Sequence, residues 1–140
     1  MKTLILTCAL VVASLCLLAC SSQGSVDVSC DDFYELQHIS QAVDVAVGDS
    51  FTVTLCSNPT TGFQWSELAD IGDQTVLQQI DHRLETPEGQ EPPAPGSPGK
   101  EVWTFKALEE GKSSVSMAYS RPWQGGEKGE WTFDLTVVVR

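Results

Sequence analysis

Basic side chains are scarce in this chain of 140 residues, which has 8 lysines and arginines against 19 aspartates and glutamates. The formal net charge of −11 opposes binding to nucleic acids and to anionic lipid headgroups, because both attract basic surfaces. The same charge favours solubility of a folded domain. The composition therefore excludes nucleic acid as a partner and leaves protein partners open.

Groups that perform chemistry are also scarce. The chain has two histidines, His38 and His82, and neither neighbours a cysteine in a nucleophile motif. No cluster has the spacing of zinc ligands, and no glycine-rich loop leads from a predicted strand into a predicted helix. We therefore expect a protein that is not an enzyme and that uses no cofactor and no metal.

A membrane-spanning apolar run is missing as well. The uncharged apolar run over residues 4–18 is about 15 residues long, short of the roughly 20 that a spanning helix needs. It follows Lys2 and precedes Leu17-Leu18-Ala19-Cys20, which resembles a bacterial lipoprotein cleavage box. A retained membrane helix is the alternative, and the short run disfavours it.

The apolar run and the cleavage box predict that the chain has three parts. These are a lipoprotein signal peptide (1–19), a lipidated N-terminus and tether (20–37), and a folded domain (38–140). Cys20 would carry a palmitate-type lipid and anchor the protein to a membrane without spanning it. The expected location is the bacterial cell envelope, at the outer membrane or facing the periplasm.

Two of the five cysteines remain once Cys8 and Cys16 are assigned to the signal peptide and Cys20 to the lipid. An exported protein could pair Cys30 with Cys56 in a disulfide, provided that the polar N-terminal arm folds back onto the domain. The alternative is one buried thiol and one exposed thiol. The sequence leaves both open.

Period-two alternation of apolar residues dominates the rest of the chain, and no segment has a convincing helical stripe. The clearest strand covers 131–139, where Trp131, Phe133 and Leu135 alternate with polar residues. About seven short strands in one small domain predict an antiparallel β-sandwich of immunoglobulin type, with Trp65 facing inward. We expect a monomer.

If successive strands run up and down, every second connection lies at the same end of the sandwich. One end would receive 58–62, 83–100 and 120–130, and these three segments hold all seven prolines of the chain. Proline restricts the backbone, so this end is predicted to be a rigid binding edge. The other end would receive short acidic turns.

The first of these segments, Ser57-Asn58-Pro59-Thr60-Thr61-Gly62-Phe63-Gln64-Trp65, resembles the signature loop of the chagasin-type inhibitors of papain-like cysteine peptidases. Arg121-Pro122-Trp123 in the third segment is similar to a second motif of that family. Gly96-Ser97-Pro98-Gly99 matches a third, glycine-rich motif only in part, because a proline replaces an expected glycine. Ordinary turn formation and a tryptophan packed on the sandwich edge are the structural alternatives.

The resemblance implies a reversible, tight-binding inhibitor of papain-family cysteine peptidases. The peptidase-binding residues would be Asn58, Pro59, Thr60, Thr61, Gly62, Phe63, Gly96, Ser97, Pro98, Gly99, Arg121, Pro122 and Trp123. The first loop would enter the active-site cleft, and the other two would contact its walls. An adhesion or ligand-binding module using the same edge is the alternative, and a purely structural envelope lipoprotein is a third hypothesis.

Overall fold

The computed structural model describes residues 24–86 and 95–140. The strands are β1 (Gly24–Asp27), β2 (His38–Val45), β3 (Ser50–Ser57), β4 (Gln64–Trp65), β5 (Asp70–Ile71), β6 (Leu77–Glu85), β7 (Gly99–Ala107), β8 (Gly111–Ser120) and β9 (Trp131–Val139). One short α-helix, α1 (Cys30–Glu35), and one turn of 3₁₀-helix, η1 (Pro59–Thr61), complete the described elements.

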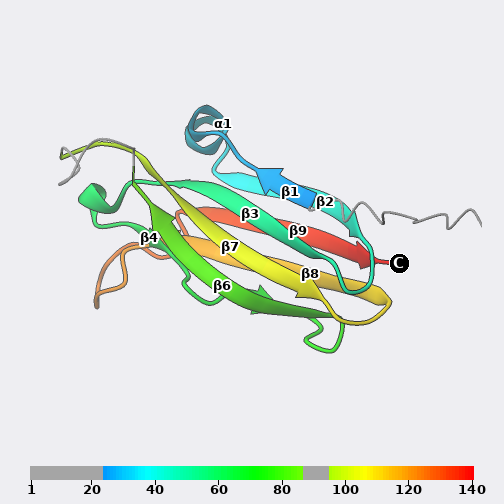
Figure 1. Cartoon of the computed structure of the whole chain (residues 1–140). Helices are drawn as coiled ribbons and strands as arrows, with labels where there is room; N and C mark the ends of the chain where they lie inside the picture. Colours follow the sequence, from blue (N-terminus) through cyan, green and yellow to red (C-terminus); the bar gives the residue numbers. More distant parts are fainter. Residues whose placement is uncertain (1–23, 87–94) are drawn as a thin grey trace, which may run out of the picture.

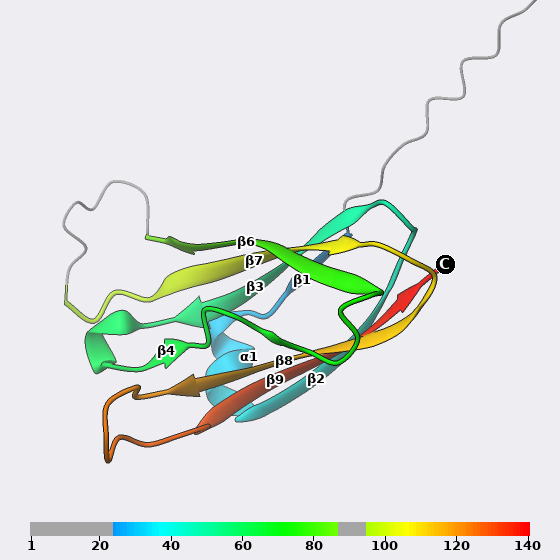
Figure 2. The same cartoon turned by 90° about the horizontal axis from the view of Figure 1, so that it is seen from below.

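The strands form two sheets that pack face to face (Figures 1 and 2). One sheet has the order β1-β3-β7-β6, and the other has the order β2-β9-β8-β4, with β5 also paired to β8. The β1–β3 and β2–β9 pairs are parallel, whereas the remaining pairs are antiparallel. The fold is an immunoglobulin-like β-sandwich, which confirms the expected class.

The alternating residues of the strands fill the space between the sheets. In β9, Phe133, Leu135 and Val137 are fully buried, while the residues between them lie toward solvent. Trp65 is buried as expected, and its Nε1 donates a hydrogen bond to the Cys56 carbonyl at 2.9 Å. The core consists of residues between Val26 and Val139, so the described part of the chain forms one self-contained domain.

The structure corrects the expected start of the domain. Residues 24–27 form β1 along β3, and Ser29 caps α1 by accepting a hydrogen bond from the Asp32 amide at 3.0 Å. Phe33 of α1 is 1% exposed. The tether expected over 20–37 must therefore be shorter, since the sandwich begins by residue 24.

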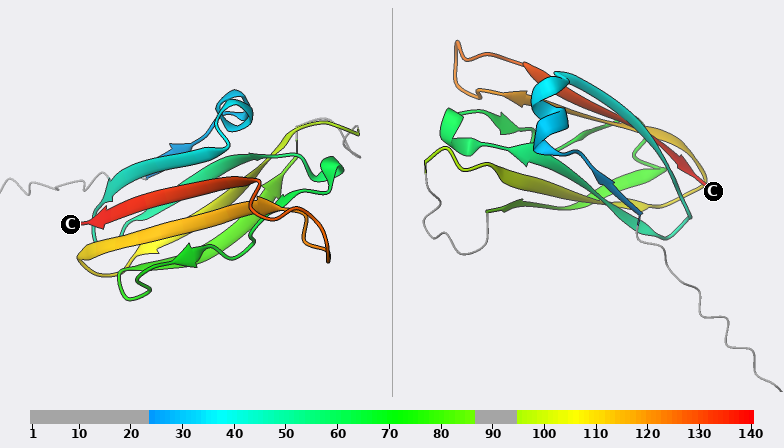
Figure 3. Two further views of the ribbon diagram at one scale, coloured as in Figure 1. Left: turned by 180° about the vertical axis from the view of Figure 1, so that it is seen from behind. Right: turned by 90° about the horizontal axis from the view of Figure 1, so that it is seen from above.

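The N-terminal arm does fold back. Cys30 and Cys56 form a disulfide, with their Cα atoms 5.0 Å apart. Seen from above, α1 lies between the edges of the two sheets (Figure 3). The disulfide thus joins this helix to the end of β3, directly before the first proline-containing loop.

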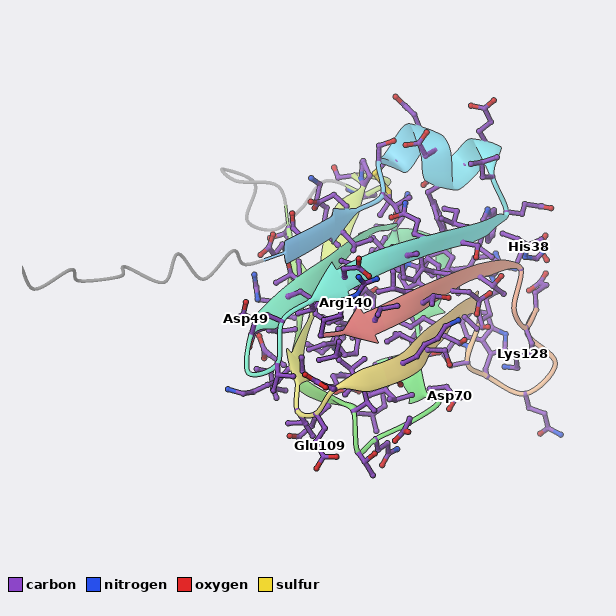
Figure 4. The ribbon with its side chains drawn as sticks, turned by 90° about the vertical axis from the view of Figure 1, so that its right-hand side faces the viewer. His38, Asp49, Asp70, Glu109, Lys128 and Arg140 are labelled. Atoms are coloured by element: carbon purple, nitrogen blue, oxygen red, sulfur yellow. A yellow bond between two sulfur atoms is a disulfide. The ribbon has the colours of Figure 1, made fainter. Side chains whose placement is uncertain are left out.

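Residues 58–62, residues 120–130 and the described ends of the second connection lie at one end of the sandwich, as the alternating topology predicts (Figure 1). Asp49 and Glu109 lie at the opposite end from Lys128 (Figure 4). The long second connection is shorter than expected because β6 continues to Glu85 and β7 begins at Gly99. The predicted signal peptide and Cys20 lie outside the described residues. Among the described helices, none has the length and hydropathy needed to cross a bilayer.

Candidate functional site

Loop 1, residues 58–63, is a tight turn built on its own sequence. Pro59 opens the 3₁₀ turn, and the Gly62 amide closes it with a 3.0 Å hydrogen bond to the Pro59 carbonyl. Gly62 has φ of 80°, a left-handed conformation that only glycine adopts without strain. The turn is exposed at Pro59, Thr60 and Thr61, which project from the end of the sandwich.

The threonine hydroxyls of loop 1 are occupied within the loop. Thr60 Oγ1 donates to Asn58 Oδ1 at 2.6 Å, and Thr61 Oγ1 donates to the Asn58 carbonyl at 2.7 Å. These bonds replace water contacts and restrain both side chains. The loop therefore presents an uncharged surface of methyl groups and backbone.

Loop 2, residues 86–98, is described only at its ends, and residues 87–94 lie outside the described part of the chain. Gly96 bonds to loop 1 in two ways: its amide donates to Thr60 Oγ1 at 3.1 Å, and its carbonyl accepts from Asn58 Nδ2 at 3.4 Å. Gly99 is buried where β7 begins beside Ser57. A Cβ at Gly99 would lie 2.9 Å from the Glu85 carbonyl oxygen, so the close strand pairing requires glycine.

Loop 3, residues 121–130, is joined to loop 1 by its first residue. Arg121 Nη2 and Nε donate to the Thr61 carbonyl at 3.2 and 3.4 Å, and Nη1 pairs with Glu127 at 2.9 Å. The Glu127 backbone amide and the Arg121 guanidinium hold the pKa of the Glu127 carboxyl below its ordinary value. Lys128 Nζ bonds to the carbonyls of Arg121 and Trp123.

Trp123 lies against loop 1 yet keeps 52% of its surface exposed. Its ring occupies the space beside Gly62: a Cβ on that residue would lie 2.6 Å from Trp123 Cη2. Gly62 is therefore required twice, by its backbone conformation and by this contact. Half of the indole remains available to a partner.

An aromatic layer supports the site from below. Phe63 stacks on Tyr119 with ring centroids 5.5 Å apart, and the Arg121 guanidinium lies 4.5 Å from the Phe63 centroid. Tyr119 accepts a hydrogen bond from the Asn58 amide at 2.8 Å. Burial raises the pKa of the Tyr119 phenol, so the hydroxyl stays neutral in this position. Phe63 thus packs into the support of the loops rather than projecting with Thr60.

Sequence reasoning missed a buried polar group beneath loops 1 and 2. Glu101 is 5% exposed; one carboxylate oxygen accepts from Ser57 Oγ at 2.6 Å, and the other lies 2.9 Å from His82 Nε2. The His82 ring stacks on Trp103 with centroids 4.9 Å apart. Glu101 shares a face of β7 with Trp103 and Phe105, and an acid at an inward position of the alternation was the available signal.

The described site residues are therefore gathered at one end of the sandwich. Asn58 donates a hydrogen bond to loop 2, and Thr60 and Thr61 accept hydrogen bonds from loops 2 and 3. His38 contacts Thr132 Oγ1 at 2.9 Å on the exposed surface. Within residues 24–86 and 95–140, no three histidine, cysteine or acidic side chains are grouped as metal ligands would be. The arrangement suits binding of a protein surface.

Comparison with known proteins gives relatives that share this fold. Amoebiasin-2 of Entamoeba histolytica is 25% identical over 96 residues, which cover 69% of this chain and 75% of that protein. The crystal structure of the cysteine protease inhibitor EhICP2 from Entamoeba histolytica superposes with a TM-score of 0.64 at 18% identity, covering 85% of this chain and 98% of that one. PbICP-C, solved in complex with falcipain-2, superposes with a TM-score of 0.55 at 17% identity, covering 84% of this chain and 99% of that one.

The sequence model of one family, described as Chagasin family peptidase inhibitor I42, matches residues 44–137. That range contains loops 1 to 3 and the strands of the sandwich, except β1, most of β2 and the last two residues of β9. Membership of a family of inhibitors confirms the expectation that the chain is not an enzyme. The chain belongs to the chagasin family of peptidase inhibitors.

Proposed function

We propose that this protein is a reversible, tight-binding inhibitor of papain-family cysteine peptidases and that loops 1 to 3 wedge into the active-site cleft. The main support is the end of the sandwich itself. An exposed, uncharged turn stands between two loops and is hydrogen-bonded to both. The relative PbICP-C, solved in complex with falcipain-2, agrees with a peptidase as the partner.

Loop 1 is the central wedge in this proposal. Pro59, Thr60 and Thr61 are exposed and carry no charge that would have to be desolvated. Their side chains would lie against the catalytic cysteine and histidine of the peptidase. Because internal hydrogen bonds already hold the turn, little conformational entropy is lost on binding.

Loops 2 and 3 contact the two walls of the cleft. Trp123 supplies a half-exposed indole, and Arg121 holds it beside loop 1 through the Thr61 carbonyl. Tryptophan and arginine are the residues most often found at binding hot spots. Residues 96–98 would contact the opposite wall, whereas Gly99 is buried at the start of β7. An interface of about 800 Å² per partner is compatible with nanomolar affinity.

A titration against several peptidases tests this function. Residues 21–140, which include every element of the sandwich, should inhibit papain and a cathepsin L-like enzyme stoichiometrically, while a serine peptidase and a metallopeptidase keep full activity. If papain and the cathepsin L-like enzyme keep full activity at micromolar inhibitor, the proposal is overturned and an adhesion or ligand-binding module is favoured. Inhibition of all four enzymes would also contradict it.

We further propose that lipidation of Cys20 tethers the protein in a bacterial envelope with its loops directed away from the membrane. Gly24 pairs with Phe51 near the start of β3, whereas loop 1 follows the other end of that strand, about 25 Å away. Cys20 can lie at most about 14 Å from Gly24, because it is four residues distant in sequence. The loops would then face peptidases in the surrounding compartment.

A further inference from the structure

Three consecutive residues at the base of loop 1 are each fixed to a different part of the molecule. Asn58 donates its amide hydrogen to Tyr119 of the opposite sheet, and Ser57 bonds to Glu101 of the neighbouring strand. Cys56 is bonded covalently to Cys30. The first two anchors lie within the range that the family model matches, whereas Cys30 lies before it. The N-terminal arm, residues 24–37, therefore supplies an additional support for the loop.

The arm also enters the aromatic layer beneath the loops. Phe33 is 1% exposed, and its ring centroid lies 5.3 Å from Tyr119, 5.6 Å from Trp65 and 5.5 Å from Trp131. In the ribbon view from above, α1 lies between the edges of the two sheets (Figure 3). Removal of α1 would abolish these ring contacts and leave Tyr119 without one of its neighbours.

Two of the hydrogen bonds at the base of loop 1 are made by rings that Phe33 contacts. Tyr119 accepts from the Asn58 amide at 2.8 Å, and Trp65 donates to the Cys56 carbonyl at 2.9 Å. A shift of either ring would lengthen the bond that it makes. The disulfide keeps Phe33 in place, because Cys30 begins the same helix and ties it to β3.

We propose that the N-terminal arm is a redox-released clamp that holds loop 1 in its binding conformation, with Cys30 and Phe33 as positioning residues. The expected effect on peptidase binding rests on the proposed inhibitory function. The effect on the mobility of loop 1 does not depend on a peptidase. With the arm attached, loop 1 is preorganised and dissociation of the complex is slow. With the arm released, loop 1 is more mobile and the complex dissociates faster.

A dithiol can open the clamp in a balanced exchange. One thiolate of the reagent attacks the Sγ of Cys30, which is partly exposed, and Cys56 leaves as a thiolate that takes up a proton. The second thiol of the reagent then displaces Cys30, which also becomes a thiol. Two electrons and two protons pass to the protein, and the dithiol becomes a disulfide.

Two variants of residues 21–140 test the clamp: the double variant Cys30→Ser with Cys56→Ser, and Phe33→Ala. Hydrogen exchange of the Asn58 amide reports on loop 1 directly, and the dissociation rate from papain reports on its function. Both variants should speed both rates on the order of tenfold. Dithiol-treated wild-type protein should match the double serine variant, and Phe33→Leu should restore most of the protection.

Leu77→Ala is the control, because Leu77 is fully buried near the opposite end and its loss destabilises the sandwich without touching loop 1. It should leave Asn58 exchange and papain dissociation unchanged in the folded protein. Unchanged Asn58 exchange in a folded double serine variant overturns the clamp. If the wild-type protein inhibits no peptidase, the proposed function fails, and the exchange rates still decide whether the arm holds loop 1.

Discussion

Gly62 shows how one residue joins two loops of the site. Its φ of 80° allows the turn, and its missing side chain admits the Trp123 ring. A larger residue would have to displace either the turn or the indole. The geometry of loops 1 and 3 therefore depends on the same position.

Gly62→Ala should weaken papain inhibition by about tenfold or more, because the new methyl group strains the backbone and displaces Trp123. Gly125→Ala is a matched control, since Gly125 has φ of 81° and open space around the position of a Cβ. Gly125→Ala should lose about 1 kcal/mol of unfolding free energy through backbone strain alone, and Gly62→Ala should lose more because Trp123 must also move. Equal inhibition constants for the two variants would contradict the contact between Gly62 and Trp123 as a determinant of binding.

Trp123→Ala should cost about 2–4 kcal/mol of binding free energy, mostly through faster dissociation, if the exposed half of the indole fills a pocket on the peptidase as proposed. The unfolding temperature should change little, since the side chain is 52% exposed. Inhibition constants and thermal unfolding are measured on the same preparation. A steep loss of thermal stability with unchanged inhibition per folded molecule would assign Trp123 to the sandwich edge alone.

At the scale of elements, β3 and β7 carry the loops, and a buried polar contact links their ends. Glu101 lies beneath loops 1 and 2 and accepts a hydrogen bond from the Ser57 hydroxyl. An acid in this place costs desolvation free energy, which the two partner groups offset. The contact fixes the spacing of the two loop bases.

Glu101→Ala should lower the unfolding free energy by about 2–3 kcal/mol, because Ser57 and His82 lose their common partner in a buried setting. Glu101→Gln should lose less, since its amide can still bond to both. Glu85→Ala is the control: this carboxylate on the adjacent strand is exposed and pairs with Arg83, so its loss should change stability by less than about 0.5 kcal/mol. Urea unfolding measures all three, and an Ala variant at position 101 as stable as the control would refute a structural role for the network.

The strands and the end at which the loops gather could be predicted from the sequence, because period-two alternation and proline placement are local signals. Helix α1 could not, because its six residues bury only Phe33 and are too few to show a helical period. Strand β1, which pairs in parallel with β3, likewise buries only Val26. A single buried residue gives no alternation to recognise. For both reasons the sequence predicts a longer tether than the structure leaves.

The candidate site was predictable as a set of residues but not as a bonded framework. The motif residues identified loops 1 to 3, whereas the hydrogen bonds from Gly96 and Arg121 to loop 1 depend on how the loops fold together. The same holds for the Cys30–Cys56 disulfide, which required the path of the arm. Long-range contacts of this kind have no local sequence pattern.

For the whole molecule, the acidic turns at the end opposite the loops matter for the proposed tether. Asp49 and Glu109 lie at the end where β1 begins (Figure 4). An anionic membrane surface would repel this end, and the domain would stand away from the lipid rather than lie flat on it. The loops would then be free to meet a peptidase in the surrounding compartment.

Cys20→Ser should release the protein from the membrane fraction and stop processing of the precursor, because no other cysteine lies at the predicted cleavage point. Membrane and soluble fractions of cells expressing each form give the result, with Cys16→Ser as the matched control that should remain membrane-bound. Unchanged membrane association of the Cys20 variant would favour a retained helical anchor instead.

The most direct test of the central claim is the dissociation constant of Thr61→Asp for papain, measured beside the wild-type protein. Thr61 is exposed in the free protein, so an aspartate there should lower the unfolding free energy by only about 1 kcal/mol, through loss of the hydrogen bond from Thr61 Oγ1 to the Asn58 carbonyl. In the cleft the same carboxylate would be desolvated without a partner, and affinity should fall on the order of a hundredfold or more. Equal dissociation constants for the two proteins would show that loop 1 does not enter the cleft, and would contradict the account.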